Sequence, residues 1–207
     1  MSVVRELVAI YADESCLGNG REGSNPGGAG ALVEYRRRGA TEIVRRDLWL
    51  SEKATTNNRM ALKSVIASLT ELGAKGARFD VVFTTDSRYI VDGMTQWVHG
   101  WARRNWTRKG GDIENLELWF DAMSAAEPHA VQWQWVRGHA GHAQNEYANH
   151  LATTAAADQT QSTGLIASGF DAWDARARAK GAKHAAPSPF PDHDEFRPHS
   201  ALPEPPL

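Results

Sequence analysis

The order of strand-like and helical segments is the feature that most constrains the fold of this chain. Three strand-like segments, residues 7–13, 29–35 and 41–50, follow one another through short polar connections, which is typical of an antiparallel meander. The later segments are a helix through residues 62–69, a strand at 79–85, helices at 88–94 and 114–126, a strand at 131–136 and a helix at 144–157. This order predicts an α/β fold with a five-stranded mixed sheet flanked by helices.

The composition changes after residue 157. The 207 residues are enough for one domain of ordinary size and an appendage. Residues 158–207 are rich in Gln, Thr, Ser, Ala and Gly and then in Pro, and such a composition buries too little apolar surface to offset chain entropy. We therefore expect a domain at residues 1–157 and a low-complexity, mostly disordered tail at residues 158–207, in which residues 170–180 are compatible with one isolated helix.

Charge and cysteine content exclude several classes of protein. The formal net charge of −2 gives no bulk attraction to nucleic acid, so any such surface must be local. The single cysteine, Cys16, excludes an internal disulfide and fits a reducing compartment. Neither a signal peptide nor an apolar run of about 20 residues, the length of a membrane span, is present. We expect a soluble, cytoplasmic protein without a membrane partner, and nothing demands more than a monomer.

Two aspartates and a histidine stand where predicted strands end. Asp13 and Asp86 each close a strand, and if those strands are neighbours, the carboxylates meet at the rim of the sheet. Two carboxylates that close repel unless a cation such as Mg²⁺ bridges them. Taken singly, each aspartate is equally well explained as a turn or capping residue. His139 lies on a glycine-containing loop between the last strand and the last helix, where it can reach into a cleft.

Tryptophan and basic residues alternate in the segment from residue 97 to residue 109. Trp97 and Trp101 share a helix face and are also explained as core residues, and the basic side chains are also explained as a solvated face. Such a concentration in a mildly acidic chain nevertheless makes a phosphate backbone a plausible partner.

Taken together, these features resemble bacterial ribonuclease HI, the type 1 ribonuclease H family, over roughly residues 5–157. Four blocks match in order, at residues 13–19, 55–60, 85–89 and 138–146. The resemblance implies a hydrolase that cuts the RNA strand of an RNA–DNA hybrid, with four carboxylates holding two Mg²⁺ ions, for which Mn²⁺ can substitute. It also implies a ribonuclease H-like fold for the domain.

The resemblance assigns roles to individual residues. Asp13 and Asp86 occupy two of the metal-ligand positions, and His139 matches the mobile histidine of the family. The residues that match the family's contacts to the hybrid, or that belong to the family's basic handle, are Cys16, Asn19, Thr56, Asn57, Asn58, Trp97, Trp101, Arg103, Arg104, Trp106 and Lys109. Arg88 is a further candidate contact, at a position where the bacterial family often carries glutamine.

Two positions depart from the family pattern. Ala61 stands where the family has glutamate, and Asn149 stands where it has aspartate. Alanine offers no ligand, and asparagine keeps one carbonyl oxygen without the charge. We therefore expect a weak second Mg²⁺ site and weakened or absent cleavage. Restoring both acids, with Ala61→Glu and Asn149→Asp, should raise Mg²⁺-dependent cleavage of hybrid RNA by orders of magnitude.

Three explanations for these departures stay open. The chain is an engineered, inactive substrate trap, or a natural paralogue that kept hybrid binding and lost cleavage, or a protein in which other acids compensate. Glu146 lies on nearly the same helix face as Asn149 and is a possible ligand with it. Glu14 replaces the usual glycine beside Asp13, but neighbours on a strand point to opposite faces, which argues against it. The sequence thus leaves two functions: a nuclease, or a catalytically inactive hybrid-binding module. An integrase-like or exonuclease-like relative of the same fold is a more distant third.

Overall fold

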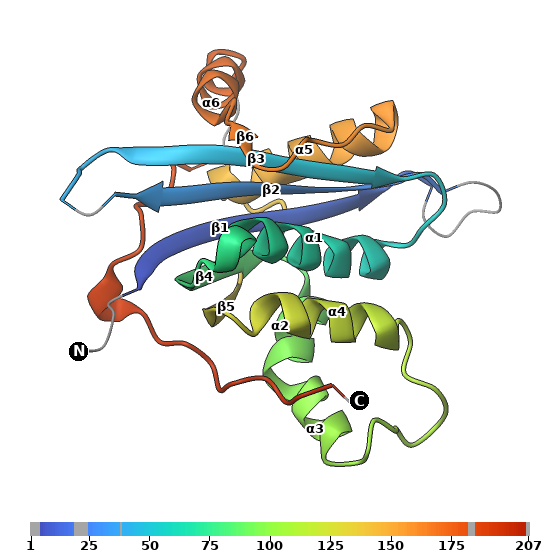
Figure 1. The fold of residues 1–207 in the computed structure, drawn as a ribbon. Helices are drawn as coiled ribbons and strands as arrows, with labels where there is room; N and C mark the ends of the chain where they lie inside the picture. Colours follow the sequence, from blue (N-terminus) through green and yellow to red (C-terminus); the bar gives the residue numbers. More distant parts are fainter. Residues whose placement is uncertain (1–4, 19–24, 38, 182–184, 206–207) are drawn as a thin grey trace.

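A six-stranded mixed sheet forms the centre of the molecule in the computed structural model, which describes residues 5–18, 25–37, 39–181 and 185–205 (Figure 1). The strands are β1 (Glu6–Cys16), β2 (Gly27–Arg36), β3 (Ile43–Glu52), β4 (Phe79–Thr85), β5 (Ala130–Trp135) and β6 (Ile166–Ala167). Their spatial order is β5-β4-β1-β2-β3-β6, with β1, β2 and β3 antiparallel and β4 and β5 parallel to β1. The antiparallel meander and the mixed α/β sheet are confirmed, but the sheet has six strands because the short β6 pairs with β3.

Helices cover both faces of the sheet (Figure 1). The helical elements are α1 (Asn57–Leu72), η1 (Ala74–Gly76), α2 (Arg88–Asp92), η2 (Gly93–Trp97), α3 (Val98–Ala102), α4 (Leu116–Ala126), α5 (Ala143–Asp158), α6 (Phe170–Ala179) and η3 (His193–Glu195). α1 and α4 lie on one face and α5 on the other. α5 approaches β2 so closely that a Cβ atom on Gly28 would lie 2.1 Å from the backbone oxygen of Ala152, so only glycine fits there.

The alternation of β1 places its side chains in two separate cores. Val8, Ile10 and Ala12 belong to the larger core, which contains α1 and α4 residues, whereas Ala9 and Tyr11 belong to the smaller core beneath α5. Both faces of β1 are therefore buried, as its continuous apolar run leads one to expect. Because the alternation continues, Asp13 leaves the strand on the α5 face and Glu14 leaves it on the α1 face.

The segment after residue 158 differs from the expected disordered tail. Its helical part, α6, packs on α5, where the rings of Trp173 and His150 lie 6.0 Å apart. The buried carboxylate of Asp47 accepts hydrogen bonds from the Tyr147 hydroxyl at 2.6 Å and from the Ser168 hydroxyl at 2.6 Å. Composition missed this docking because a few aromatic and hydroxyl residues, placed at the right positions, hold a segment that is polar on average. The domain boundary near residue 157 stays a prediction.

Residues 185–205, here called the strap, run along the β5 side of the sheet (Figure 1). The backbone N–H of His199 donates to the carbonyl oxygen of Val131 at 2.9 Å, and the N–H of Trp133 donates to Nδ1 of His199 at 3.1 Å. The strap thereby satisfies hydrogen-bonding groups of the edge strand β5, which would otherwise be open to pairing. Among the described residues, no helix has the length and apolar character needed to cross a bilayer.

Candidate metal centre and nucleic-acid surface

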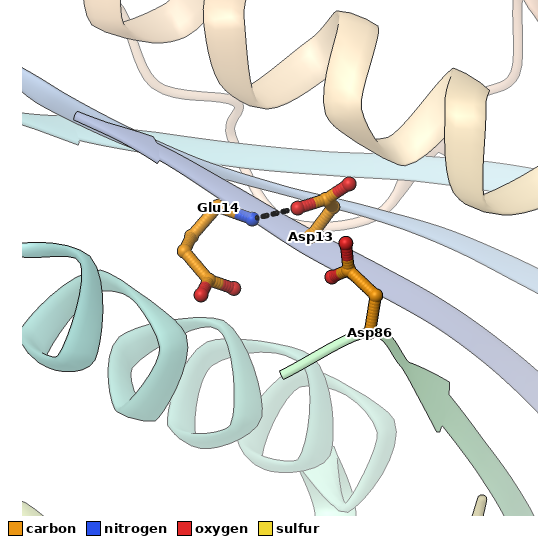
Figure 2. Close-up of side chains that lie close together, drawn as sticks. All are labelled: Asp13, Glu14 and Asp86. Carbon is orange, nitrogen blue, oxygen red and sulfur yellow. Dashed lines mark hydrogen bonds between the residues drawn. The ribbon is translucent and has the colours of Figure 1, made fainter. Parts of the chain in front are cut away.

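Three carboxylates meet where β1 and β4 end. β1 and β4 are parallel neighbours with Ala12 opposite Thr85, so the next residues, Asp13 and Asp86, lie side by side at the rim of the sheet. Ligand oxygens of Asp13, Glu14 and Asp86 all lie within 4.8 Å of one another. Figure 2 shows the Asp86 carboxylate beside that of Asp13, which lies on the α5 side, and the Glu14 side chain extending toward α1. An acidic cluster of this size is able to hold a metal ion.

The position of Glu14 contradicts the argument made against it from strand alternation. Its Cβ does leave β1 on the face opposite that of Asp13, as alternation requires. Beyond Ala12, however, β1 has no paired β4 residue beside it, because β4 ends at Thr85, and the longer glutamate side chain brings its carboxylate close to that of Asp86 (Figure 2). The rejection of Glu14 as a compensating acid was therefore wrong in its geometry.

Burial and mutual repulsion make the charged form of this cluster costly. Burial, followed by the charge of Asp86, raises the pKa of Asp13 to about 8. Burial, followed by the charges of Asp13 and Asp86, raises the pKa of Glu14 well above its usual range. Burial is also the first cause of the raised pKa of Asp86. A divalent cation at this position would remove both the repulsion and the cost of burying the charges.

A buried atom without a hydrogen bond marks the side of the cluster that a ligand would occupy. The Oε2 atom of Glu14 is buried and has no hydrogen-bond partner among the described residues. Asp13, by contrast, accepts hydrogen bonds on both oxygens, from the backbone N–H of Glu14 at 2.7 Å and from Nδ2 of Asn145 at 3.4 Å. A buried carboxylate oxygen is expensive to leave unpaired, so the donor set of the cluster fits a hard divalent cation.

The two positions that depart from the family pattern lie on the helices that flank the cluster. Ala61 of α1 is fully buried and shares the larger core with Ala12, on the face toward which Glu14 extends. Asn149 of α5 is half-buried, and its Oδ1 accepts a hydrogen bond from the hydroxyl of Thr153 at 3.5 Å. Glu146, one turn before Asn149, is partly exposed and lies 3.9 Å from Nδ1 of His139.

The loop that carries His139 passes directly over Asp86. A Cβ atom on Gly138 would lie 2.1 Å from Oδ2 of Asp86, so glycine at this position allows the loop backbone to approach the carboxylate. The next residue, His139, adopts a positive φ of 52°, and its side chain is 74% exposed. The imidazole is therefore open to solvent near the acidic cluster, and a positive charge on it lowers the pKa of Asp86.

Two residues of the centre had no assigned role in the sequence-based expectations. Asn145, which is only 2% exposed, orients the Asp13 carboxylate, and its place in a matching block was the only signal. Trp135 is 37% exposed at the end of β5, and its Nε1 donates to the backbone oxygen of Asp86 at 3.0 Å. The guanidinium of Arg88 stacks on the Trp135 ring at 4.1 Å, which places a cation beside the cluster.

Four of the expected nucleic-acid contacts gather around the start of α1. Cys16 ends β1, and its thiol contacts the backbone oxygen of Thr55 at 3.4 Å. Thr56 caps α1 by accepting from the backbone N–H of Arg59, and Asn57 and Asn58 follow in the first turn. The Oδ1 atom of Asn57 is buried without a hydrogen-bond partner among the described residues. Asn19 lies outside the described residues.

The basic and aromatic residues form a projection below the sheet, built by η2, α3 and the loop that follows (Figure 1). Trp97 and Trp101 pack with Trp119 of α4, with ring centroids 6.4 and 5.6 Å from it, as their explanation as core residues requires, and their contact with nucleic acid stays a prediction. Trp97 is still 36% exposed. The exposed basic side chains of this projection, which we call the handle, are Arg103, Arg104, Arg108 and Lys109, and Trp106 lies between them half-buried.

Comparisons with known proteins agree on one family. The model of the RNase H family matches residues 5–157. A ribonuclease H of Pectobacterium carotovorum is 40% identical over 158 residues, which are 76% of this chain and 94% of that protein. A crystal structure described as "LC9-RNase H1, a type 1 RNase H with the type 2 active-site motif" is 65% identical, covers 98% of this chain and 96% of its own, and superposes with a TM-score of 0.92. The solution structure of the PFV RNase H domain, at 16% identity and a TM-score of 0.62, covers 75% of this chain and 97% of its own and shares the fold.

Proposed function

Because the chain belongs to the ribonuclease H family, we propose that it is a divalent-cation-dependent endonuclease that cleaves the RNA strand of RNA–DNA hybrids. The observation that carries this proposal is the cluster of Asp13, Glu14 and Asp86 at the rim of the sheet. The cluster contains one carboxylate more than the family positions alone provide. The expectation of an inactive enzyme rested on two metal-binding carboxylates, Asp13 and Asp86. With Glu14, the cluster has three carboxylates.

The metal-holding residues are Asp13, Glu14 and Asp86, and Asn149 offers a carbonyl oxygen from α5. When bound, Mg²⁺ or Mn²⁺ supplies the Lewis acidity that activates water and neutralises charge on the leaving oxygen. In our proposal the Glu14 carboxylate serves as the metal ligand that the family supplies with a glutamate at the position of Ala61. The relative that is 65% identical is itself described as a type 1 RNase H with the type 2 active-site motif, which supports a relocated acid.

The other residues orient, bind and move protons. Asn145 holds Asp13 through its side-chain amide, and Gly138 brings the loop onto Asp86. His139, exposed and close to Glu146, is placed to carry a proton between the centre and solvent. The handle and the start of α1 bind the two strands of the hybrid, with phosphates on the basic side chains and ribose hydroxyls on the amides of Asn57 and Asn58.

The second candidate function is a hybrid-binding module without cleavage. The observation that favours it is Asn149, because the neutral amide leaves the centre with less charge than four carboxylates would give. A weak second metal site is the consequence in either case. The finer expectations, namely Mg²⁺ as the physiological ion, a monomeric state and a cytoplasmic location, stay predictions.

Cleavage of a labelled hybrid, with duplex DNA and duplex RNA as competitors, distinguishes the two functions. We expect Mg²⁺- or Mn²⁺-dependent cutting of the RNA strand that EDTA abolishes. Glu14→Gln removes one carboxylate charge and should lower kcat by roughly 100-fold or more, as loss of a group that stabilises transition-state charge does. The control Glu117→Gln changes an exposed glutamate of α4 and should keep full activity. Hybrid binding without any metal-dependent cutting would establish the binding module instead.

A further inference from the structure

The strap reaches back to the loop that carries His139. The backbone N–H of Ala185 donates to the carbonyl oxygen of Gly141 at 2.7 Å. Three residues later, the N–H of Ser188 donates to Oε1 of Gln144 at 3.0 Å, and Nε2 of Gln144 donates to the carbonyl oxygen of Ser188 at 2.9 Å. The side-chain amide of Gln144 thus pairs with the strap backbone much as one strand pairs with another, and Gln144 is fully buried.

A second link joins the strap to the first turn of α5. The hydroxyl of Ser188 lies 3.1 Å from Nε2 of His142, which is the N-cap residue of α5. Nδ1 of His142 accepts from the backbone N–H of Asn145 at 3.4 Å. Because that backbone group is always a donor, the ring proton sits on Nε2 and is donated to Ser188. Burial lowers the pKa of His142 and favours the neutral ring that this arrangement needs.

The same turn of α5 holds the metal centre. Nδ2 of Asn145 donates to Oδ2 of Asp13, and Asn149 follows one turn later. The ring of Tyr11, which shares β1 with Asp13, lies 5.5 Å from the ring of His142. A continuous set of contacts therefore leads from Ser188 through His142 and Asn145 to Asp13. No other described residue of the strap is joined to this turn by a side-chain hydrogen bond.

We propose that Ser188 is a positioning residue for the metal centre, which acts through His142 and Gln144 to fix the start of α5 and so the contact of Asn145 with Asp13. The proposal rests on the proposed function for its kinetic consequences. The strap is in this sense a component of the active site that lies outside residues 5–157, the part matched by the family model. Without Ser188, the N-cap residue loses one of its two ring partners and α5 loses a fixed starting point.

Steady-state cleavage of hybrid by Ser188→Ala, Ser188→Thr and wild type tests the proposal. Loss of this partly buried hydrogen bond should lower kcat of Ser188→Ala by about fivefold, with KM unchanged and Tm lowered by no more than about 4 °C. Ser188→Thr keeps the hydroxyl and should retain the wild-type kcat. The matched control is His193→Ala, which removes a hydrogen bond of the same strap to Asp80, at the far end of β4 from Asp86.

A double-mutant cycle shows whether Ser188 acts through His142. His142→Asn keeps a good N-cap side chain but breaks the link to Ser188, so it should lower kcat by about as much as Ser188→Ala. Adding Ser188→Ala to His142→Asn should then cause no further loss. Additive losses would contradict the route through His142, and an equal loss in His193→Ala would show a general effect of the strap on stability.

Calorimetric titration with Mn²⁺, without substrate, tests the role of Ser188 independently of the proposed nuclease activity, because it measures metal affinity and not cleavage. Because Asn145 orients Asp13, Ser188→Ala should weaken Mn²⁺ binding by about threefold while His193→Ala leaves it unchanged. A wild type that binds Mn²⁺ but does not cut hybrid would contradict the nuclease, and the Mn²⁺ affinities would still decide the role of Ser188. Wild-type values of both kcat and Mn²⁺ affinity in Ser188→Ala would overturn the role.

Discussion

At the scale of single residues, two departures from the family pattern are complementary. Glu14 stands where the family has glycine, and Ala61 stands where it has glutamate. Glu14 extends from β1 toward the α1 face, where Ala61 is fully buried. A small residue at position 61 leaves room for a carboxylate that arrives from the strand. In our proposal, the departure at position 61 and the departure at position 14 therefore belong to one arrangement, in which the carboxylate lost from α1 is supplied by β1.

This exchange predicts the outcome of moving the acid. Ala61→Glu alone adds a buried carboxylate on the side to which Glu14 points and should lower activity, whereas the sequence predicts a gain from Ala61→Glu combined with Asn149→Asp. Glu14→Gly combined with Ala61→Glu should recover at least about tenfold over Glu14→Gly alone, since one carboxylate of charge returns to the centre. Hybrid cleavage under Mg²⁺ measures both. A large gain in activity from Ala61→Glu in the wild-type background would refute the exchange.

The raised pKa of Asp13 predicts how the metal-free protein responds to pH. Between its ordinary value of 3.8 and about 8, Asp13 binds a proton in the folded state and not in the unfolded state. The free energy of unfolding therefore falls as pH rises through this window, because the folded state binds more protons. Asp13→Asn removes this penalty and should raise the Tm at pH 8 by about 5 °C in EDTA, with little difference at pH 4. Thermal unfolding in EDTA at both pH values checks this, and a lower Tm of Asp13→Asn at pH 8 would contradict it.

At the scale of elements, the sequence was most informative where periodicity and topology agree. The sequence left open whether the strands that carry Asp13 and Asp86 are neighbours; the structure pairs β1 with β4 in parallel, which brings the two carboxylates together. Glu14 escaped the same reasoning because alternation describes where a Cβ points and not where a long side chain ends. The helix expected at residues 88–94 continues through η2 and α3, and Gly93 within it leaves the space that the Trp119 ring occupies.

The handle is an element whose contribution should appear in salt dependence. Arg103→Ala with Arg104→Ala removes two exposed charges, so KM should rise and the slope of log affinity against log salt should fall by about 1 to 2 units. The value of kcat should stay unchanged because the handle lies away from the carboxylates. Arg176→Ala with Lys180→Ala is a charge-matched control at the C-terminal end of α6. If kcat falls and the salt slope does not, the handle does not bind phosphates.

At the scale of the whole molecule, the C-terminal segment is the part that the sequence described least well. Composition averages over many residues, whereas the docking depends on a few specific contacts. The carboxylate of Asp47, which is 3% exposed, is the main one, since it accepts from Tyr147, Ser168 and the backbone N–H of Gly169. These contacts tie β3, α5 and the segment before α6 together, so the segment should unfold with the domain.

Removing Asp47 should therefore destabilise the entire protein. Asp47→Ala leaves three donors without their acceptor and should lower the free energy of unfolding by about 3 kcal/mol. Urea denaturation followed by tryptophan fluorescence measures this loss. Asp121→Ala, an exposed aspartate on α4, should change it by less than about 0.5 kcal/mol. An early, separate transition for the C-terminal segment would contradict the single cooperative unit.

The account depends most on a metal ion held by acids from β1 and β4, with Glu14 among them. Anomalous diffraction from crystals soaked in Mn²⁺ tests this directly, because it locates the ion independently of activity. We expect an anomalous peak bounded by carboxylate oxygens of Asp13, Glu14 and Asp86, and loss of that peak or a marked drop in its height in Glu14→Gln. A peak held by Asp13 and Asp86 while the Glu14 carboxylate stays outside ligand distance would contradict it.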